Sequence, residues 1–179
     1  MRLVTYRGEA GERAGVDTDA GVFDAAALLG ERSASVRGLI ARDRVGELRE
    51  RLESGIDVID PIPAPELLPP ITDPEKIVCI GLNYRSHAAE AGIDPPPDPT
   101  FFAKFRNALA SPGSTVKLPA ASEKVDYEAE IAFVVGRRCK EIDSGDDPVE
   151  APAVRDSLQL VLAGVLEREP AARDEVLTV

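Results

Sequence analysis

Short apolar runs separated by turn residues fill the first part of the chain. Residues 3–6, 14–17 and 22–23 are strand-like, and the DTDAG stretch at residues 17–21 contains the Asp and Gly residues that are typical of turns. A three-stranded meander is therefore predicted at the N-terminus.

Helical spacing follows the predicted strands. Asp24 is expected to cap a short helix over residues 25–29, since its carboxylate can accept hydrogen bonds from the first N–H groups of a helix. Ser33 is the corresponding candidate cap for a second helix, and residues 47–52 predict a third, charged helix at the surface. The second helix carries apolar residues at helical spacing, which are Val36, Leu39 and Ile40.

A proline-rich segment separates the two parts of the chain. Six prolines lie between Asp60 and Pro74, and because neither a helix interior nor a central strand accepts them, a stiff linker is predicted. We expect a small α+β domain over residues 1–70, linker included, and a second domain over residues 71–179.

After the linker the apolar runs are longer. Residues 76–80 end at Gly81 and predict a buried strand leading into GLNYRSHAAE, where a helix is expected to start near Asn83. TFFAKF predicts a strand, SPGSTVKLP a turn and a short strand, and VDYEAEIAFVVG a central strand that is apolar on both faces in its last part. In the tail, apolar residues match one helical face: Val154, Leu158, Val161, Leu162 and Val165.

The charge balance narrows the choice of partners. The chain has 21 basic and 32 acidic residues and a formal net charge of -11, so nucleic acid and anionic membrane surfaces are expected to be repelled. No apolar run approaches the roughly 20 residues of a membrane span, and the first residues lack the apolar core of a secretory signal. We expect a cytoplasmic protein whose two cysteines, Cys79 and Cys139, form no metal-binding pair by themselves.

Two carboxylates lie two positions apart in the predicted strand VDYEAEIAFVVG. Side chains alternate along a strand, so Glu128 and Glu130 share one face with Ala132 and Val134. Two acids on an apolar face are costly unless a cation compensates their charge, and such hard oxygen ligands favour Mg, Mn or Ca. A divalent metal site is one interpretation of this pair, and a solvated edge strand is the other.

His87, the only histidine, precedes Glu90 by three positions in the expected helix. At that spacing two side chains are neighbours on one face, and a carboxylate beside an imidazole fixes its tautomer and raises its basicity, as a general base requires. A packed or exposed polar histidine is the alternative. Lys104 alternates with Phe102 and could hold a substrate carboxylate, with an exposed strand lysine as the alternative; Arg85 has the same two interpretations.

Four motifs, taken in order, carry a family resemblance. KIVCIGLNYRSHAAEAG, PTFFAKF, SPGSTVKLP and VDYEAEIAFVVGRR follow one another between about residues 70 and 140, and together they resemble the fumarylacetoacetate hydrolase family. The stretches MRLVTYRG and GVDTDAGVFDAAAL also resemble the small N-terminal domain of bacterial and archaeal members.

The resemblance implies an α+β, β-rich fold in which the second domain is a catalytic domain of mixed sheets rolled into a barrel. It also implies a homodimer with a divalent ion, Mg or Mn first and Ca as a further candidate. The substrates would be 2-oxo or 1,3-dioxo acids of aromatic catabolism, processed by C–C hydrolysis or keto–enol isomerisation. By this resemblance the metal ligands are Glu128 and Glu130, the catalytic pair is His87 and Glu90, and the substrate contacts are Lys104, Tyr84 and Arg85.

The resemblance is incomplete towards the C-terminus. The family's third metal-binding carboxylate is an aspartate after the E-x-E pair, and nothing from Arg138 to Val179 matches its motif; Asp156 has different neighbours. The catalytic domain is therefore expected to be truncated: an altered gene product, a shortened member completed by a partner chain, or an incomplete piece. The first is preferred because the tail carries no family motif. The alternative function is an inactive member that serves only as a binding or oligomerisation module.

Overall fold

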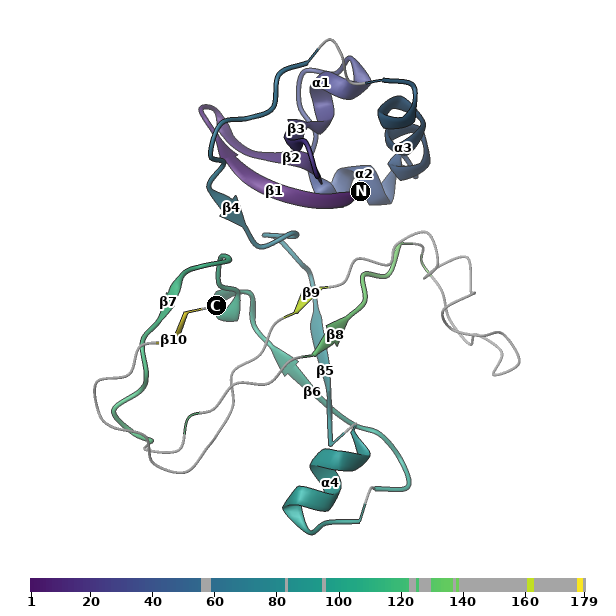
Figure 1. Ribbon diagram of the computed structural model, residues 1–179. Helices are drawn as coiled ribbons and strands as arrows, with labels where there is room; N and C mark the ends of the chain where they lie inside the picture. The colour runs from purple at the N-terminus through teal and green to yellow at the C-terminus, as the bar shows by residue number, and fades with distance from the viewer. Residues whose placement is uncertain are drawn as a thin grey trace. The chain divides into compact units, whose positions relative to one another are not determined.

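The computed structural model in Figure 1 describes residues 1–55, 59–82, 84–94, 96–122, 125, 130–136, 138, 161–162 and 177–178. The chain forms two compact units: the first comprises Met1–Ile71 with Ala110–Val179, and the second Thr72–Leu109. These units group residues by contact, so the division at residue 70 into separate domains stays a prediction. None of the described helices is long and apolar enough to cross a membrane.

A four-stranded antiparallel sheet organises the N-terminal part of the first unit. Strands β1 (Arg2–Gly8), β2 (Gly11–Thr18) and β3 (Gly21–Asp24) form a meander, as predicted, and β4 (Leu67–Leu68) pairs with β1. The strand order is β3-β2-β1-β4. The proline-rich segment is therefore more than a linker, because it supplies an edge strand.

Three helices follow the meander: α1 (Ala25–Leu29), α2 (Val36–Ala41) and α3 (Val45–Glu53). Asp24 caps α1, as predicted, and accepts a 2.7 Å hydrogen bond from the N–H of Ala27. The prediction that Ser33 caps α2 is wrong, because the cap is Ser35. Ser35 lies directly before the helix, where its hydroxyl accepts a 3.1 Å hydrogen bond from the N–H of Gly38.

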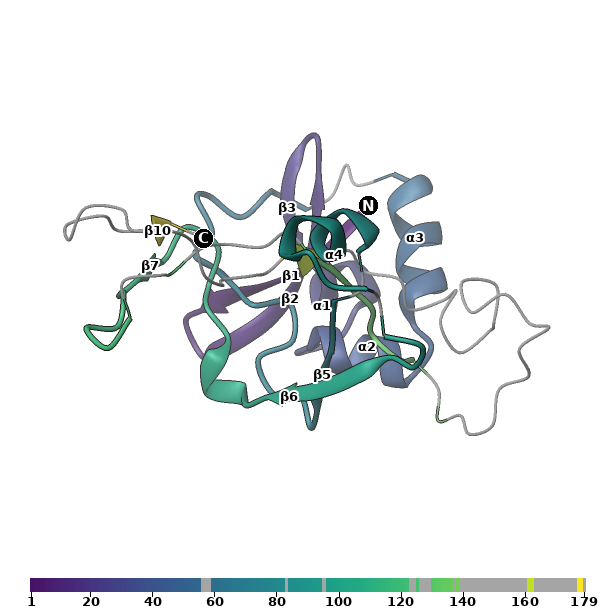
Figure 2. The same cartoon turned by 90° about the horizontal axis from the view of Figure 1, so that it is seen from below.

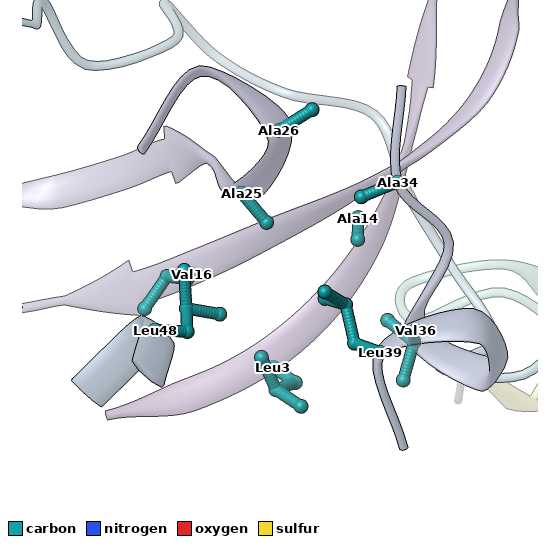
Figure 3. Packing of buried hydrophobic residues seen from close by; sticks show 9 residues of the cluster. All are labelled: Leu3, Ala14, Val16, Ala25, Ala26, Ala34, Val36, Leu39 and Leu48. Carbon is teal, nitrogen blue, oxygen red and sulfur yellow. The ribbon is translucent and has the colours of Figure 1, made fainter. Parts of the chain in front are cut away.

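The helices pack on one face of this sheet and enclose a core (Figure 3). Leu3 of β1 and Val16 of β2 are cross-strand partners on that face, and the helix residues Leu39 and Leu48 are fully buried against them. Alternation along each strand sends the intervening side chains to the opposite face. The buried cluster comprises Leu3, Ala14, Val16, Ala25, Ala26, Ala34, Val36, Leu39 and Leu48.

Gly15 of β2 lies on the opposite face, where neighbouring side chains leave no room for a methyl group. A Cβ there would lie 2.9 Å from Val22 Cγ1, 3.1 Å from Val4 Cγ2 and 3.3 Å from Tyr6 Cδ1. Gly15→Ala is therefore expected to lower the free energy of unfolding by about 2 kcal/mol, because these side chains must shift. Urea unfolding followed by circular dichroism measures this. Gly46→Ala is the matched control in α3, where a Cβ meets nothing within 4 Å; an equal loss in that variant would contradict the prediction.

The described residues of the second unit form a two-stranded ladder and a helix. β5 (Ile77–Gly81) pairs antiparallel with β6 (Thr100–Lys104), and the two strands run side by side in both views (Figures 1 and 2). The helix α4 (Arg85–Ala91) lies between them in sequence, and the 3-10 helix η1 (Arg106–Ala108) follows β6.

The predicted burial of β5 is wrong. Register places Val78, Ile80 and Phe101 on one face of the β5–β6 ladder, and these side chains are 63%, 43% and 61% exposed. On the other face, Ile77 and Cys79 are half-buried. The apolar run correctly indicated a strand, but burial needs a second layer, and the described residues place none over the exposed face.

Two short ladders complete the described residues of the first unit: β7 (Thr115–Val116) with β10 (Leu177–Thr178), and β8 (Ile131–Ala132) with β9 (Val161–Leu162). The prediction of a central strand in VDYEAEIAFVVG is wrong for its described residues. Among these residues β8 pairs with β9 alone, and Ile131, Phe133 and Val135 are exposed.

The predicted helix of the tail is also wrong where the structure describes it. Val161 and Leu162 form a strand rather than part of a helical face, because their backbone pairs with Ile131 and Ala132. The other members of that predicted face lie outside the described residues: Val154, Leu158 and Val165.

Candidate active site

The helix α4 carries the proposed catalytic pair. His87 is its third residue and is exposed, and Glu90 follows three positions later. Helix geometry places positions i and i+3 on one face, so the helical placement of the pair is confirmed. The helix begins at Arg85, close to the predicted start at Asn83, which lies outside the described residues. The catalytic role of the pair stays a prediction.

The two ends of α4 are held differently. At the C-terminal end, Gly92 is left-handed with φ 64°, and the N–H of Ile93 donates to the carbonyl of Ala88 at 3.0 Å. At the N-terminal end, Tyr84 makes no side-chain capping bond. Ala88 is 2% exposed, whereas the adjacent His87 is exposed. The imidazole therefore lies on the open side of the helix.

The proposed substrate contacts fall at two ends of the β5–β6 ladder. Tyr84 and Arg85 are exposed and stand at the start of α4, three residues or more after β5 ends. Lys104 is half-buried and pairs with Ile77, at the other end of the ladder from Gly81. Four residues of strand separate the two ends, which is about 13 Å. The structure therefore groups Tyr84 and Arg85 with His87, and it does not group Lys104 with them.

Glu130 lies directly before β8 and is half-buried. Exposure alternates along the residues that follow: Ala132 and Val134 are half-buried, whereas the odd-numbered positions between and after them are exposed. Glu130 thus shares the less exposed side with two apolar residues, as the alternation in the sequence predicted. Glu128 lies outside the described residues, so its position on that side stays a prediction.

A metal site would need more ligands than Glu130. Within the part of the chain that the structure describes, no group of three or more His, Cys, Asp or Glu side chains is placed to hold an ion. Glu130 belongs to the first unit and His87 to the second. The carboxylate of Glu130 has the right chemistry for one hard oxygen ligand, and the proposed metal site stays a prediction.

A polar cluster that was not predicted from the sequence lies on the sheet face opposite the helices. Asp24 accepts hydrogen bonds from Arg13 Nε at 2.7 Å, from Arg13 Nη2 at 3.0 Å and from the Tyr6 hydroxyl at 2.5 Å. Burial raises the pKa of Asp24, but hydrogen bonds from Arg13, Tyr6 and the N–H of Ala27 outweigh burial and hold that pKa below its ordinary value. Burial, and then the bond to Asp24, raises the pKa of Tyr6. Both carboxylate oxygens are used within the fold, so the cluster stabilises the sheet.

One hollow of about 470 Å³ lies in the first unit, lined by residues 65–67 and 111–114. Its titratable lining residue, Glu66, pairs with Arg7 at 2.9 Å. None of the proposed site residues that the structure describes lines this hollow. It therefore adds no chemistry to the site on α4.

Comparison with known protein families gives a match that begins after the proline-rich segment. The profile described as "Fumarylacetoacetate (FAA) hydrolase C-terminal" matches residues 76–154. This range includes β5, α4, β6 and β8.

Curated relatives match part of the chain. Oxaloacetate tautomerase fahd2, mitochondrial, of Xenopus laevis is 45% identical over 80 residues, which cover 45% of this chain and 25% of that protein. Protein Rv2993c of Mycobacterium tuberculosis is 36% identical over 115 residues, which cover 64% of this chain and 39% of that protein. The chain therefore spans well under half the length of these relatives.

Solved structures share the fold. Maleylpyruvate hydrolase from Sphingobium sp. SYK-6, in complex with manganese (II) ion and pyruvate, superposes with a TM-score of 0.62 at 29% identity, covering 82% of this chain and 53% of that one. Fumarylacetoacetate hydrolase from Exiguobacterium antarcticum gives a TM-score of 0.64 at 20% identity, covering 82% and 50%, and shows the fold alone. The chain has the mixed, β-rich α/β fold of these structures over about half of their length.

Proposed function

The chain belongs to the fumarylacetoacetate hydrolase family, and on this premise we propose that it catalyses metal-dependent keto–enol tautomerisation or C–C hydrolysis of 2-oxo acids. The observation that carries the proposal is α4, which presents the only histidine on its open side, three positions before Glu90, inside the range that matches the family. One relative is named as an oxaloacetate tautomerase, and another is a maleylpyruvate hydrolase solved in complex with manganese and pyruvate. A cytoplasmic homodimer is part of the proposal.

His87 is proposed to move the proton. When oxaloacetate enolises, the C3–H bond breaks, a double bond forms between C2 and C3, and the C2 carbonyl oxygen gains a proton. The imidazole of His87 would accept the C3 proton and then release it to that oxygen, and Glu90 would stabilise the imidazolium between the two transfers. In hydrolysis the same imidazole would take a proton from water, whose oxygen attacks the carbonyl. The adjacent C–C bond would then break, its electron pair would leave as the enolate of the other fragment, and that enolate would take up the proton from the imidazolium.

Three side chains that can donate hydrogen bonds are proposed to bind the substrate. Arg85 and Tyr84 are proposed to hold a substrate carboxylate beside His87, because all three are exposed within one stretch of chain. Lys104 is proposed as a further contact, with less support, because register puts it at the other end of the ladder.

Glu128 and Glu130 are proposed to hold Mg or Mn, with Ca as a further candidate. The support is that Glu130 is half-buried on the side of Ala132 and Val134, where an uncompensated charge is costly. The ion would polarise the substrate carbonyl as a Lewis acid when bound.

The test uses the fact that His87 is the only histidine, so its imidazole Cε–H gives a single NMR signal that needs no assignment. Substoichiometric Mn²⁺ is expected to broaden this signal, because the proposed mechanism requires the ion and the imidazole to act on the same substrate, and Mn²⁺ relaxes nearby protons. Glu130→Gln is expected to abolish the broadening, and excess Mg²⁺ to reverse it.

Glu66→Gln is the matched control, because it removes a carboxylate whose partner is the surface residue Arg7. Broadening should persist in that variant. Failure of Mn²⁺ to broaden the signal of the folded parent chain would support the alternative function, an inactive member that serves as a binding or oligomerisation module.

A further inference from the structure

Leu82, which lies three positions before the first residue of α4 and directly after β5, adopts a backbone conformation that side chains disfavour. Among the described residues, three that are not glycine have positive φ: Asp43 at 55°, Ala64 at 44° and Leu82 at 50°. In this left-handed region the Cβ crowds the following carbonyl, and aspartate tolerates it better than leucine does. Leu82 is the bulkiest of the three, and it is the one that adjoins the proposed catalytic helix.

The position of Leu82 shows what the conformation does. Pairing with β6 continues to the last residue of β5, where Gly81 faces Thr100. Tyr84, three residues later, is already the N-cap of α4 with φ -102° and ψ 131°. The strand therefore ends at Gly81 and the helix begins after Tyr84, and the left-handed Leu82 is the residue that directly follows the strand.

The neighbouring glycine does not supply the turn. Gly81 is not among the residues with positive φ, and a Cβ there would come no nearer than 3.9 Å to the carbonyl oxygen of Thr100. A disfavoured conformation persists only when the structure on both sides imposes it. Here the ladder with β6 holds one side up to Gly81, and the hydrogen bonds of α4 hold the other, beginning with the 3.1 Å bond that the N–H of Ala88 donates to the carbonyl of Tyr84.

We propose that the left-handed turn at Leu82 is a positioning element that sets the direction in which α4 leaves β5 and thereby places His87. The inference rests on the proposed function of His87 as the proton carrier. What position 82 must provide is the backbone conformation, and the isobutyl group is secondary. Residues that reach the left-handed region easily should therefore preserve the site, and β-branched residues of similar bulk should not.

The experiment compares Leu82→Gly, Leu82→Asn and Leu82→Val by the NMR signal of the His87 imidazole in the metal-free and substrate-free chain. Gly and Asn populate the left-handed region readily, so both variants should keep the parent signal position. Val is stiff at χ1 and does not adopt this conformation, so Leu82→Val should shift the signal. A role in packing alone gives the reverse order, because Val preserves more of the side chain than Gly or Asn does.

Leu109→Val is the matched control. Leu109 belongs to the same unit and is 36% exposed, with φ -74° and ψ 133°, a conformation that valine adopts readily. This variant should leave the His87 signal in place. A parent-like signal in Leu82→Val, or shifts in the Gly and Asn variants, would overturn the proposal; if Leu82→Val does not fold, the Gly and Asn variants decide alone.

Turnover supplies a second measurement if the chain is active. A helix misdirected by an ångström costs on the order of 100-fold in rate, so Leu82→Val should lose about that much in kcat with little change in KM. Leu82→Gly should keep the kcat of the parent chain. Since the NMR comparison needs no metal and no substrate, an inactive parent chain would refute the proposed function and still leave the positioning role to be decided by the signal of His87.

Discussion

Replacing His87 by alanine is expected to lower the rate of oxaloacetate tautomerisation by about 100-fold to 10,000-fold, the usual contribution of a positioned general base. The side chain is exposed on α4, so its removal should leave the fold intact. The expected pattern is a loss in kcat with little change in KM, because the imidazole acts on the proton that is transferred in the transition state and contributes little to substrate binding. Decay of the ultraviolet absorbance of the enol, with added Mg²⁺ or Mn²⁺, measures the rate.

Ser86→Ala is the control for this loss. Ser86 is the exposed residue next to His87 on the same helix, and no catalytic role is proposed for it. It should keep the parent rate, and Glu90→Gln should lose an intermediate amount, because the imidazolium would lack its carboxylate. Equal turnover in His87→Ala and the parent would place the proton transfer elsewhere in the chain.

Much of the N-terminal sheet could be predicted from sequence because its determinants are local. Alternation marked the strands, and each hairpin closes through two residues followed by a glycine with positive φ, which is 119° at Gly11 and 122° at Gly21. The cap of α2 was misplaced by two residues because Ser33 and Ser35 are chemically equivalent, and the backbone alone decides which one is extended and next to the helix.

The errors in the later part of the chain have a common physical cause. An apolar run such as that of β5 shows that a segment can be buried, but the surface that buries it comes from residues distant in sequence. Val78 and Ile80 are exposed because no described residues cover their face of the ladder. Val161 and Leu162 fit a helical spacing as well as a strand, and pairing with Ile131 and Ala132 decided between the two.

The candidate site also combines a part that local sequence spacing determines and a part that depends on distant segments. The placement of His87 and Glu90 on one helix needs only their spacing of three residues and a glycine at the helix end, so sequence sufficed. A metal site requires ligands brought together from distant segments. The polar cluster of Tyr6, Arg13 and Asp24 was partly predictable. The two-residue turn after Gly8 sets the register that places Tyr6 opposite Arg13.

Asp24→Ala is expected to lower the free energy of unfolding of the N-terminal sheet by about 3 kcal/mol at neutral pH, since it removes a helix cap and charge-assisted hydrogen bonds at once. The carboxylate is 13% exposed and Arg13 is 27% exposed, so water replaces these bonds poorly. Urea unfolding followed by circular dichroism measures the loss. Asp17→Ala is the matched control: Asp17 also pairs with an arginine on this sheet, but Arg2 is 73% exposed, so the loss should stay below about 1 kcal/mol.

The effect of Asp24 should also depend on pH in one direction. Its pKa is below the ordinary value in the folded chain, although burial opposes this, because Arg13, Tyr6 and the N–H of Ala27 stabilise the charged form. A carboxyl with a lowered folded pKa contributes its full stability above its unfolded pKa of about 3.9 and loses that contribution as pH falls through the folded pKa. The stability difference between parent and Asp24→Ala should therefore be constant near neutral pH and shrink below about pH 4. A difference that stays constant into strong acid would show that the carboxylate charge is not what holds the cluster together.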